Sequence, residues 1–218
     1  MTEAAVRAVE CVRVLSKSSQ NLVGEVLRGC GEFTEWEHYP PDDVYDGETH
    51  SQYFFHAHPP DERSDPDYGH FHTFLTRAGI PDGIRPVTQT GAHDRPCHLV
   101  AISMTREGMP ERLFTANRWV TGETWYAASD VIAMLDRFNM DLAYPSWPLN
   151  QWLSAMLVLF RPQIEWLVRE RDAVVADWQR KFPDRDAFED RELEVTSTLP
   201  ISLASQIEWL DRQAAAHA

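Results

Sequence analysis

Two His-x-His pairs in the first half of the chain restrict its fold more than any other feature. They are His56-Ala57-His58 and His70-Phe71-His72, and His70 follows His58 by twelve positions. Alternate side chains of a β-strand point to the same face, so each pair presents both imidazoles on one side when it is extended. The intervening segment 59–69 is acidic and rich in turn-forming residues. We therefore predict two adjacent antiparallel strands that carry four imidazoles on one face.

Four converging imidazoles predict a mononuclear transition-metal site held by His56, His58, His70 and His72, or by three of them. Neighbours across paired strands lie ~5 Å apart and alternate residues of one strand ~7 Å apart, which suits one ion with ligands at ~2.1 Å. The arrangement is similar to carbonic anhydrase, in which a strand His-x-His supplies zinc ligands. All-nitrogen ligation is compatible with Zn, Fe, Cu or Ni, and the expected cofactor is one ion of Zn, Fe or Cu.

The histidine cluster is also compatible with roles that need no directly bound ion. A histidine among apolar residues is commonly a hydrogen-bonded residue of the core or the surface, and a single pair carries little information. A haem with one axial histidine and a pocket of aromatic side chains is a second candidate, and a metal-free, pH-sensitive cluster is a third. The occurrence of both pairs within seventeen residues favours the metal.

The segment His56-x-His58-x3-Glu62-x6-Gly69 resembles part of the first cupin motif, in which the His-x-His and the Glu bind a metal. The resemblance covers fourteen residues, and the sequence also differs from the cupin pattern. The leading Gly is not at the cupin distance from His56, no second motif follows, and the expected strands are too few for a cupin barrel. We therefore interpret Glu62 as a solvated loop acid rather than a ligand. His98, at the start of a later strand, is the next candidate ligand.

The composition excludes several classes of protein. The formal net charge of −14 disfavours binding to nucleic acid and to anionic membranes. The three cysteines form no Cys-x-x-Cys, and no apolar run approaches the ~20 residues that span a bilayer. The N-terminus lacks the features of a secretory signal, so the expected location is the cytoplasm. An acidic interaction or immunity-type protein without catalysis remains an alternative function.

The rest of the chain predicts an α+β fold in one domain spanning residues 1–218, with the segment after about residue 181 as a candidate mobile region. We expect an N-terminal helix or helix pair, a central, mainly antiparallel sheet of about four strands, and C-terminal helices packed on it. The helix pair is expected between Thr2 and Gly29, the strands at Ser51–His58, His70–Thr76, His98–Thr105 and Arg112–Trp125, and the later helices at Ser129–Asn139, Leu149–Phe160, Pro162–Arg180 and Leu203–Arg212. An irregular stretch is expected at Phe33–Asp46 and a last strand-like segment at Leu193–Thr198.

Asn117, Arg118 and Trp119 have the mixed chemistry of a pocket wall, although packing in the core is the favoured interpretation. No nucleotide-binding glycine motif and no nucleophile motif is present. The sequence thus predicts a metal-binding protein, and an enzymatic version would be a metal-dependent hydrolase or oxygenase with a small-molecule substrate.

Overall fold

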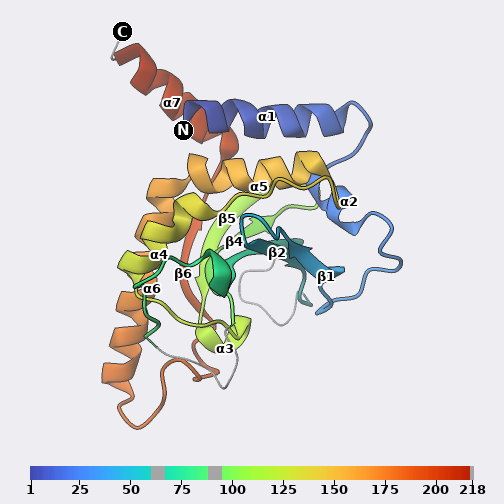
Figure 1. Ribbon diagram of the computed structural model, residues 1–218. Helices are drawn as coiled ribbons and strands as arrows, with labels where there is room; N and C mark the ends of the chain where they lie inside the picture. The colour runs from blue at the N-terminus through green and yellow to red at the C-terminus, as the bar shows by residue number, and fades with distance from the viewer. Residues whose placement is uncertain (60–66, 88–94, 217–218) are drawn as a thin grey trace.

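The computed structural model describes residues 1–59, 67–87 and 95–216. It is an α+β fold in which N-terminal helices precede an antiparallel sheet and further helices follow it (Figure 1). The elements are α1 (Thr2–Ser16), α2 (Leu22–Leu27), β1 (Tyr39–Tyr45), β2 (Ser51–His56), β3 (Gly69–Leu75), η2 (Arg77–Gly79), β4 (Cys97–Met104), β5 (Pro110–Ala116), α3 (Arg118–Thr121), α4 (Ala128–Met134), η3 (Leu135–Arg137), α5 (Trp147–Leu159), α6 (Arg161–Lys181), β6 (Val195–Pro200) and α7 (Leu203–Ala216).

The sheet has six strands in the order β1-β2-β3-β4-β5-β6, and every neighbouring pair is antiparallel. The predicted class is confirmed, but the expectation of about four strands is wrong. The strand-like segment near Leu193 joins the sheet as β6. The stretch Phe33–Asp46, expected to be irregular, contains β1, because an edge strand tolerates Pro40 and Pro41 where a central strand would lose ladder hydrogen bonds.

The expected strand Arg112–Trp125 is also too long. β5 ends at Ala116, and the Asn117 side chain accepts a hydrogen bond from the backbone N–H of Arg118 at the start of α3. Gly122, with φ 62°, closes this helix in the left-handed conformation that glycine adopts without strain. The apolar residues Trp119 and Val120 are therefore helical rather than extended, and Gly122 caps the helix.

The helix boundaries agree with the sequence at the N-terminus and differ at α4. The helix pair expected between Thr2 and Gly29 is confirmed as α1 and α2, and Asn21 caps α2 by accepting from the Gly24 N–H at 2.8 Å. The helix expected from Ser129 begins at Ala128 as α4, and its N-cap residue Ala127 makes no side-chain cap hydrogen bond. The first N–H of α4, that of Ala128, donates instead to Asp172 of α6 at 2.6 Å. A cap supplied by a residue 44 positions away leaves no local signal in the sequence.

One face of the sheet is covered by α5, and α1 lies on the far side of α5, so the molecule is layered (Figure 1). This position explains why α5 is apolar on nearly all sides. Trp152 of α5 is fully buried against Phe71 of β3, and Tyr53 of β2 donates to the Asn150 side chain at 2.6 Å. None of the described helices combines the length and apolar character needed to cross a bilayer.

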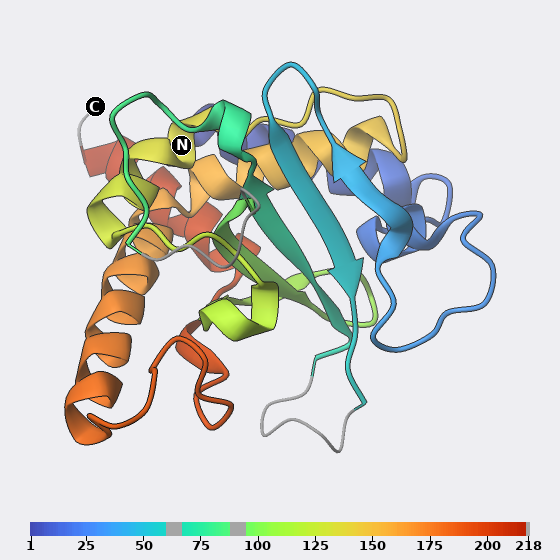
Figure 2. The ribbon, with the colours of Figure 1, turned by 60° about the horizontal axis from the view of Figure 1, so that its bottom comes forward.

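The opposite face of the sheet is turned forward in Figure 2. On β3, Phe71 and Leu75 point toward α5, whereas His70, His72 and Phe74 point to this second face, as the alternation along a strand requires. The shared antiparallel register places residues of β2, β4 and β5 beside them.

Gly69, at the start of β3, is a position where only glycine fits. Its φ is +149°, and a Cβ atom there would lie 2.3 Å from the Phe55 ring and 2.9 Å from the His56 carbonyl oxygen. We expect Gly69→Ala to lower the free energy of unfolding by about 2–3 kcal/mol through strain and overpacking. The matched control is Gly47→Ala, whose nearest atom would lie 3.9 Å away. Urea unfolding measures both, and equal midpoints for the two variants would contradict this account of the β2–β3 contact.

Candidate metal centre

Three cross-strand rows build the second face of the sheet. The first row is His56, His70, Ser103 and Arg112, one residue from each of β2 to β5. The second row is Phe54, His72, Ala101 and Phe114, and the third contains Gln52, Phe74 and His98. The small residues Ala101 and Ser103 lie directly opposite His72 and His70. This pairing leaves room for imidazole rings on the face.

The structure brings His56, His70 and His72 together. Each offers one ring nitrogen such that the three atoms all lie within 4.8 Å of one another. The ring centroids are 4.5 Å apart for His56 and His70, 5.1 Å for His56 and His72, and 5.0 Å for His70 and His72. All three side chains are buried. Two imidazoles from β3 and one from β2 therefore meet at one point above the sheet.

His58 lies just beyond the end of β2 and faces the same group. Its Nε2 atom is 3.4 Å from Nε2 of His56, and its ring centroid is 5.3 Å from that of His70. The half-exposed Trp36 packs on His58 with ring centroids 4.1 Å apart. The prediction that both pairs approach each other on antiparallel strands is confirmed for β2 and β3. His58 occupies the more exposed margin of the cluster.

The Asp67 carboxylate contacts the His70 ring, and the Arg112 guanidinium lies beside that carboxylate. Nδ1 of His70 lies 3.2 and 3.1 Å from the two carboxylate oxygens of Asp67. Arg112 approaches Asp67 at 3.6 Å, and its Nε and Nη2 atoms donate to Ser103 Oγ at 3.3 and 3.2 Å. The Asp67 side chain is only 2% exposed. Neither charged residue was predicted from the sequence, in which the only local signal is the spacing of three between Asp67 and His70.

His98, named from the sequence as the next candidate, contacts His72. Its Nε2 atom lies 3.0 Å from Nδ1 of His72, so one ring donates to the other. Burial, together with Arg171 and His70, lowers the pKa of His98 from 6.5 to about 3. His98 is therefore neutral at physiological pH. A neutral imidazole has one acceptor nitrogen available for a neighbour.

Aromatic side chains surround the cluster. Phe54 and Phe114 lie 5.2 and 5.9 Å from the His72 ring, and Phe74 lies 5.1 Å from the His98 ring. All three phenylalanines are buried. His38 stacks on Phe54 at 3.6 Å and shares a hydrogen bond with Asp43, so it belongs to the outer wall. An apolar wall lowers the local dielectric and strengthens electrostatic interactions inside it.

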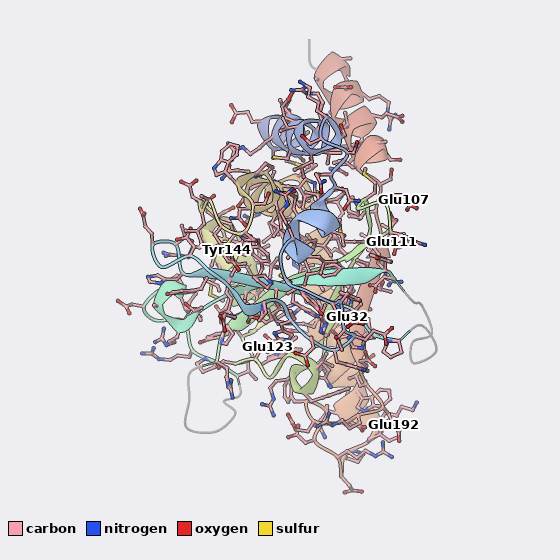
Figure 3. The ribbon with its side chains drawn as sticks, turned by 90° about the vertical axis from the view of Figure 1, so that its right-hand side faces the viewer. Glu32, Glu107, Glu111, Glu123, Tyr144 and Glu192 are labelled. Atoms are coloured by element: carbon pink, nitrogen blue, oxygen red, sulfur yellow. The ribbon has the colours of Figure 1, made fainter. Side chains whose placement is uncertain are left out.

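Glu123 lies behind His98 on the side of the sheet away from α1, close to α3 (Figure 3). Its side chain is fully buried and accepts hydrogen bonds from the His98 backbone N–H at 3.0 Å and from Thr121 Oγ1 at 3.2 Å. Burial raises its pKa from 4.5 to about 7, although Arg171 and these donors act to lower it. Nothing in the sequence around Gly122 distinguished this glutamate from a surface acid.

The raised pKa of Glu123 predicts a specific pH dependence of stability. Because the folded chain keeps a proton that the unfolded chain releases between pH 4.5 and about 7, the contribution of this group falls as pH rises through that window. The glutamine of Glu123→Gln cannot ionise. We expect the free energy of unfolding of Glu123→Gln, compared with that of wild type, to rise by up to about 3 kcal/mol between pH 5 and pH 8 when both proteins are treated with chelator. Glu192→Gln, at an exposed position, is the control. Parallel stability curves for wild type and Glu123→Gln would be evidence against a buried, protonated carboxyl.

The other residues singled out from the sequence lie elsewhere. Asn117 is buried and donates to the carbonyls of Ala187 and Leu193, the Trp119 indole also donates to Leu193, and the Arg118 side chain pairs with Glu189. These three residues hold the 187–194 segment against the sheet, as expected of packing residues. His50 interacts with Tyr45. Glu62, the acid of the cupin-like segment, lies outside the described residues, as do His93, Asp94 and His217.

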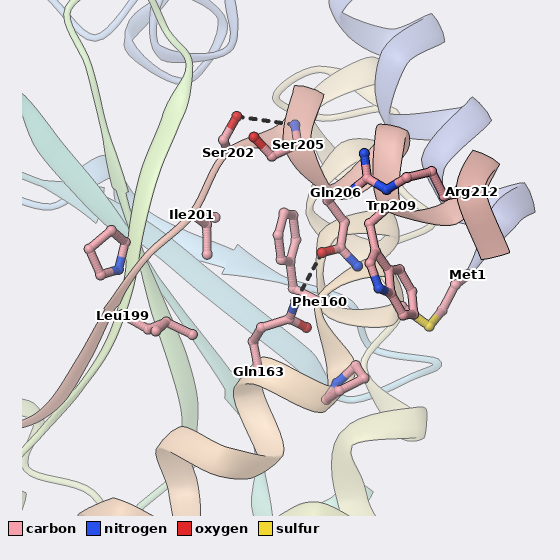
Figure 4. Close-up of a pocket in the computed structure, with 12 residues that line it drawn as sticks. Met1, Phe160, Gln163, Leu199, Ile201, Ser202, Ser205, Gln206, Trp209 and Arg212 are labelled. Carbon is pink, nitrogen blue, oxygen red and sulfur yellow. Dashed lines mark hydrogen bonds between the residues drawn. The ribbon is translucent and has the colours of Figure 1, made fainter.

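A separate groove of about 460 Å³ lies between the start of α6, the end of β6 and α7 (Figure 4). Phe160, Leu199 and Trp209 are among its lining residues, and Gln163 donates to Gln206 at 2.9 Å within it. Its lining, drawn from the described residues, contains no histidine, cysteine or carboxylate side chain. The groove therefore offers none of the imidazole, thiolate or carboxylate ligands that commonly bind Zn or Fe.

Comparison with protein families gives a match over most of the chain. Residues 2–201 match a protein family described as a domain of unknown function (DUF6969). No curated protein and no solved structure matches the chain.

Proposed function

The chain belongs to the family described as a domain of unknown function (DUF6969), and from the geometry of its histidines we propose that it is a metal-binding protein. One transition-metal ion per chain is held by His56, His70 and His72. The observation that supports this most strongly is the convergence of three buried imidazole nitrogens within 4.8 Å of one another, from two paired strands. Neutral imidazoles suit Zn, Fe and Cu, which are the ions we propose.

The donor set fits such an ion after a small inward movement. In a tetrahedral site with metal–nitrogen distances of about 2.1 Å, two ligand nitrogens lie about 3.4 Å apart. The three nitrogens lie within 4.8 Å of one another, and they reach this spacing when side-chain rotation brings each pair closer by up to about 1.4 Å. Backbone hydrogen bonds between the strands and packing against α5 hold the backbone of β2 and β3 in place, so the imidazole side chains make this movement.

In this proposal His58 either binds the ion as a fourth ligand or lies beside an open coordination position. Two imidazoles bound to one tetrahedral ion have their nitrogens about 3.4 Å apart, and Nε2 of His58 is 3.4 Å from Nε2 of His56. With His58 bound, the site is closed, which suits metal storage or a structural role. When His58 is displaced, a position opens toward the more exposed side.

We favour the open form as the working state, in which the protein is a metal-dependent hydrolase or oxygenase acting on a small molecule. A bound ion with an open position supplies Lewis acidity, or activates water or dioxygen. The aromatic residues around the ion exclude water and give a small substrate apolar surfaces to bind. The buried side chains of Phe54, Phe74 and Phe114 form the wall behind the triad, and Trp36 packs beside His58 at the exposed margin. The net charge of −14 disfavours nucleic acid as the partner.

The proposed function is tested by metal analysis of protein purified without a histidine tag. We expect one equivalent of Zn, Fe or Cu per chain to remain after gel filtration, because a multi-imidazole site binds these ions tightly. An absorption spectrum of the same sample tests the haem alternative through its Soret band. Protein that retains no metal after loading with each of the three ions and gel filtration would refute the proposal.

A further inference from the structure

The two β3 histidines of the proposed site each have one ring nitrogen engaged by a buried neighbour. Nδ1 of His70 faces the Asp67 carboxylate at 3.1–3.2 Å, and Nδ1 of His72 faces Nε2 of His98 at 3.0 Å. In both rings the engaged atom is Nδ1. Nε2 is therefore the nitrogen of each ring that can face the ion.

We propose that Asp67 and His98 are positioning residues that keep His70 and His72 protonated on Nδ1, so that both present the Nε2 lone pair to one ion. This inference rests on the proposed metal-binding function. An ionised carboxylate only accepts hydrogen bonds, so the proton between Asp67 and His70 lies on the imidazole. For His72 the same result follows when His98 acts as acceptor through Nε2. A hydrogen bond to the distal nitrogen fixes the tautomer and the ring orientation of a metal-ligating histidine.

The register of the sheet explains why these partners are available. Ser103 pairs with His70 on one side and with Arg112 on the other, and Arg112 in turn approaches Asp67. The guanidinium therefore holds the carboxylate beside His70 rather than leaving it to solvent. His98 reaches His72 because the β3–β4 register has an irregularity between Thr73 and Phe74, which sets His98 opposite Phe74 on the histidine face.

The partners differ in chemical type, and this difference predicts unequal roles. The Asp67 carboxylate, beside the Arg112 guanidinium, makes the His70 imidazole a stronger metal ligand, whereas the His98 ring orients His72 through one hydrogen bond. Replacing the carboxylate by an amide keeps its shape and removes its charge. Asp67→Asn is therefore expected to weaken Zn²⁺ binding about 10–100-fold.

The matched control for this variant is Asp43→Asn. Asp43 also contacts a histidine Nδ1, that of His38, at 2.9 Å, but His38 is not part of the triad. We expect Asp43→Asn to bind Zn²⁺ as tightly as wild type. For His98 the pair is His98→Phe, which removes the acceptor, and His98→Gln, which restores one. The expected order of Zn²⁺ affinity is wild type, then His98→Gln, then His98→Phe.

The direct experiment is ¹⁵N nuclear magnetic resonance of histidine-labelled wild-type protein, recorded without metal and after loading with Zn²⁺. Long-range proton–nitrogen correlations identify which ring nitrogen carries the proton. We expect His70 and His72 to carry it on Nδ1 in both states, with Nε2 shifted by Zn²⁺. A proton on Nε2 of either ring in the metal-free protein, or equal Zn²⁺ affinities for Asp67→Asn and Asp43→Asn, would overturn the inference. Failure of wild type to bind Zn²⁺, Fe or Cu, with both protons on Nδ1, would instead refute the proposed function and leave the two hydrogen bonds established.

Discussion

His70→Ala is expected to lose stoichiometric metal while the fold is retained. His70 occupies the centre of the cluster, with ring centroids 4.5 Å from His56 and 5.0 Å from His72. Structural zinc sites gain about 10–16 kcal/mol from four ligands, so removal of one ligand should weaken binding by at least about 100-fold. We expect the same loss for His56→Ala and His72→Ala. Metal content after gel filtration and competition with a chelator measure the effect.

The control for these variants is His50→Ala. His50 contacts Tyr45 and lies outside the cluster, so its removal should leave metal content unchanged. Circular dichroism separates loss of a ligand from loss of the fold. Retention of wild-type affinity by His70→Ala would show that the metal, if any, binds elsewhere. Unfolding of all three triad variants would indicate a metal that holds the fold together, which is a structural role rather than a catalytic one.

Arg171→Ala is expected to be the most destabilising single change outside the metal centre. Arg171 of α6 is 1% exposed, and its guanidinium lies 4.0 Å above the Trp125 ring. It donates to the Tyr126 carbonyl at 2.6 Å and to Asp172 at 2.8 and 3.0 Å. Asp172 is 32% exposed, so the cost comes mainly from the lost hydrogen bond to the Tyr126 carbonyl, about 1–3 kcal/mol, and from the lost cation–π contact, about 2 kcal/mol. We therefore expect a total loss of about 3–5 kcal/mol.

The matched control is Arg169→Ala, two positions earlier on the same helix. The Arg169 side chain is 60% exposed and pairs with Glu165 at 3.1 Å. Exposed pairs of this kind contribute about 0–1 kcal/mol. Urea unfolding of chelator-treated protein measures the free energy of unfolding of both variants. The slope of that free energy against urea concentration should also be compared between the variants. A loss for Arg171→Ala no greater than that for Arg169→Ala would contradict the structural role assigned to this guanidinium.

The local elements of the fold could be predicted from the sequence because their signals are local. The sequence predicted a helix pair between Thr2 and Gly29, and α1 and α2 lie there. Alternation along the two His-x-His segments placed them on strands, and β2 and β3 pair as expected. β1 and α3 were missed for different reasons. Pro40 and Pro41 conceal an edge strand, and the apolar residues Trp119 and Val120 suit a strand and a short helix equally well.

The surroundings of the histidines depend on register between distant segments, which no local pattern reveals. His98 reaches His72 only because of the irregularity between β3 and β4, and Arg112 reaches Asp67 through two strand pairings. Glu123 becomes a buried acid because the chain folds back under the His98 backbone. The sequence thus predicted which residue type gathers at the site, whereas the partners of each ring required the three-dimensional structure.

The most direct test of a metal held by His56, His70 and His72 is anomalous X-ray diffraction from crystals of untagged, metal-loaded protein. Data collected above and below the absorption edge of the ion identify the element and locate it. We predict a single strong anomalous peak on the face of the sheet away from α5, about 2.1 Å from one nitrogen of each of the three rings. The absence of a peak within reach of His70, or a peak held by other residues, would contradict the proposal.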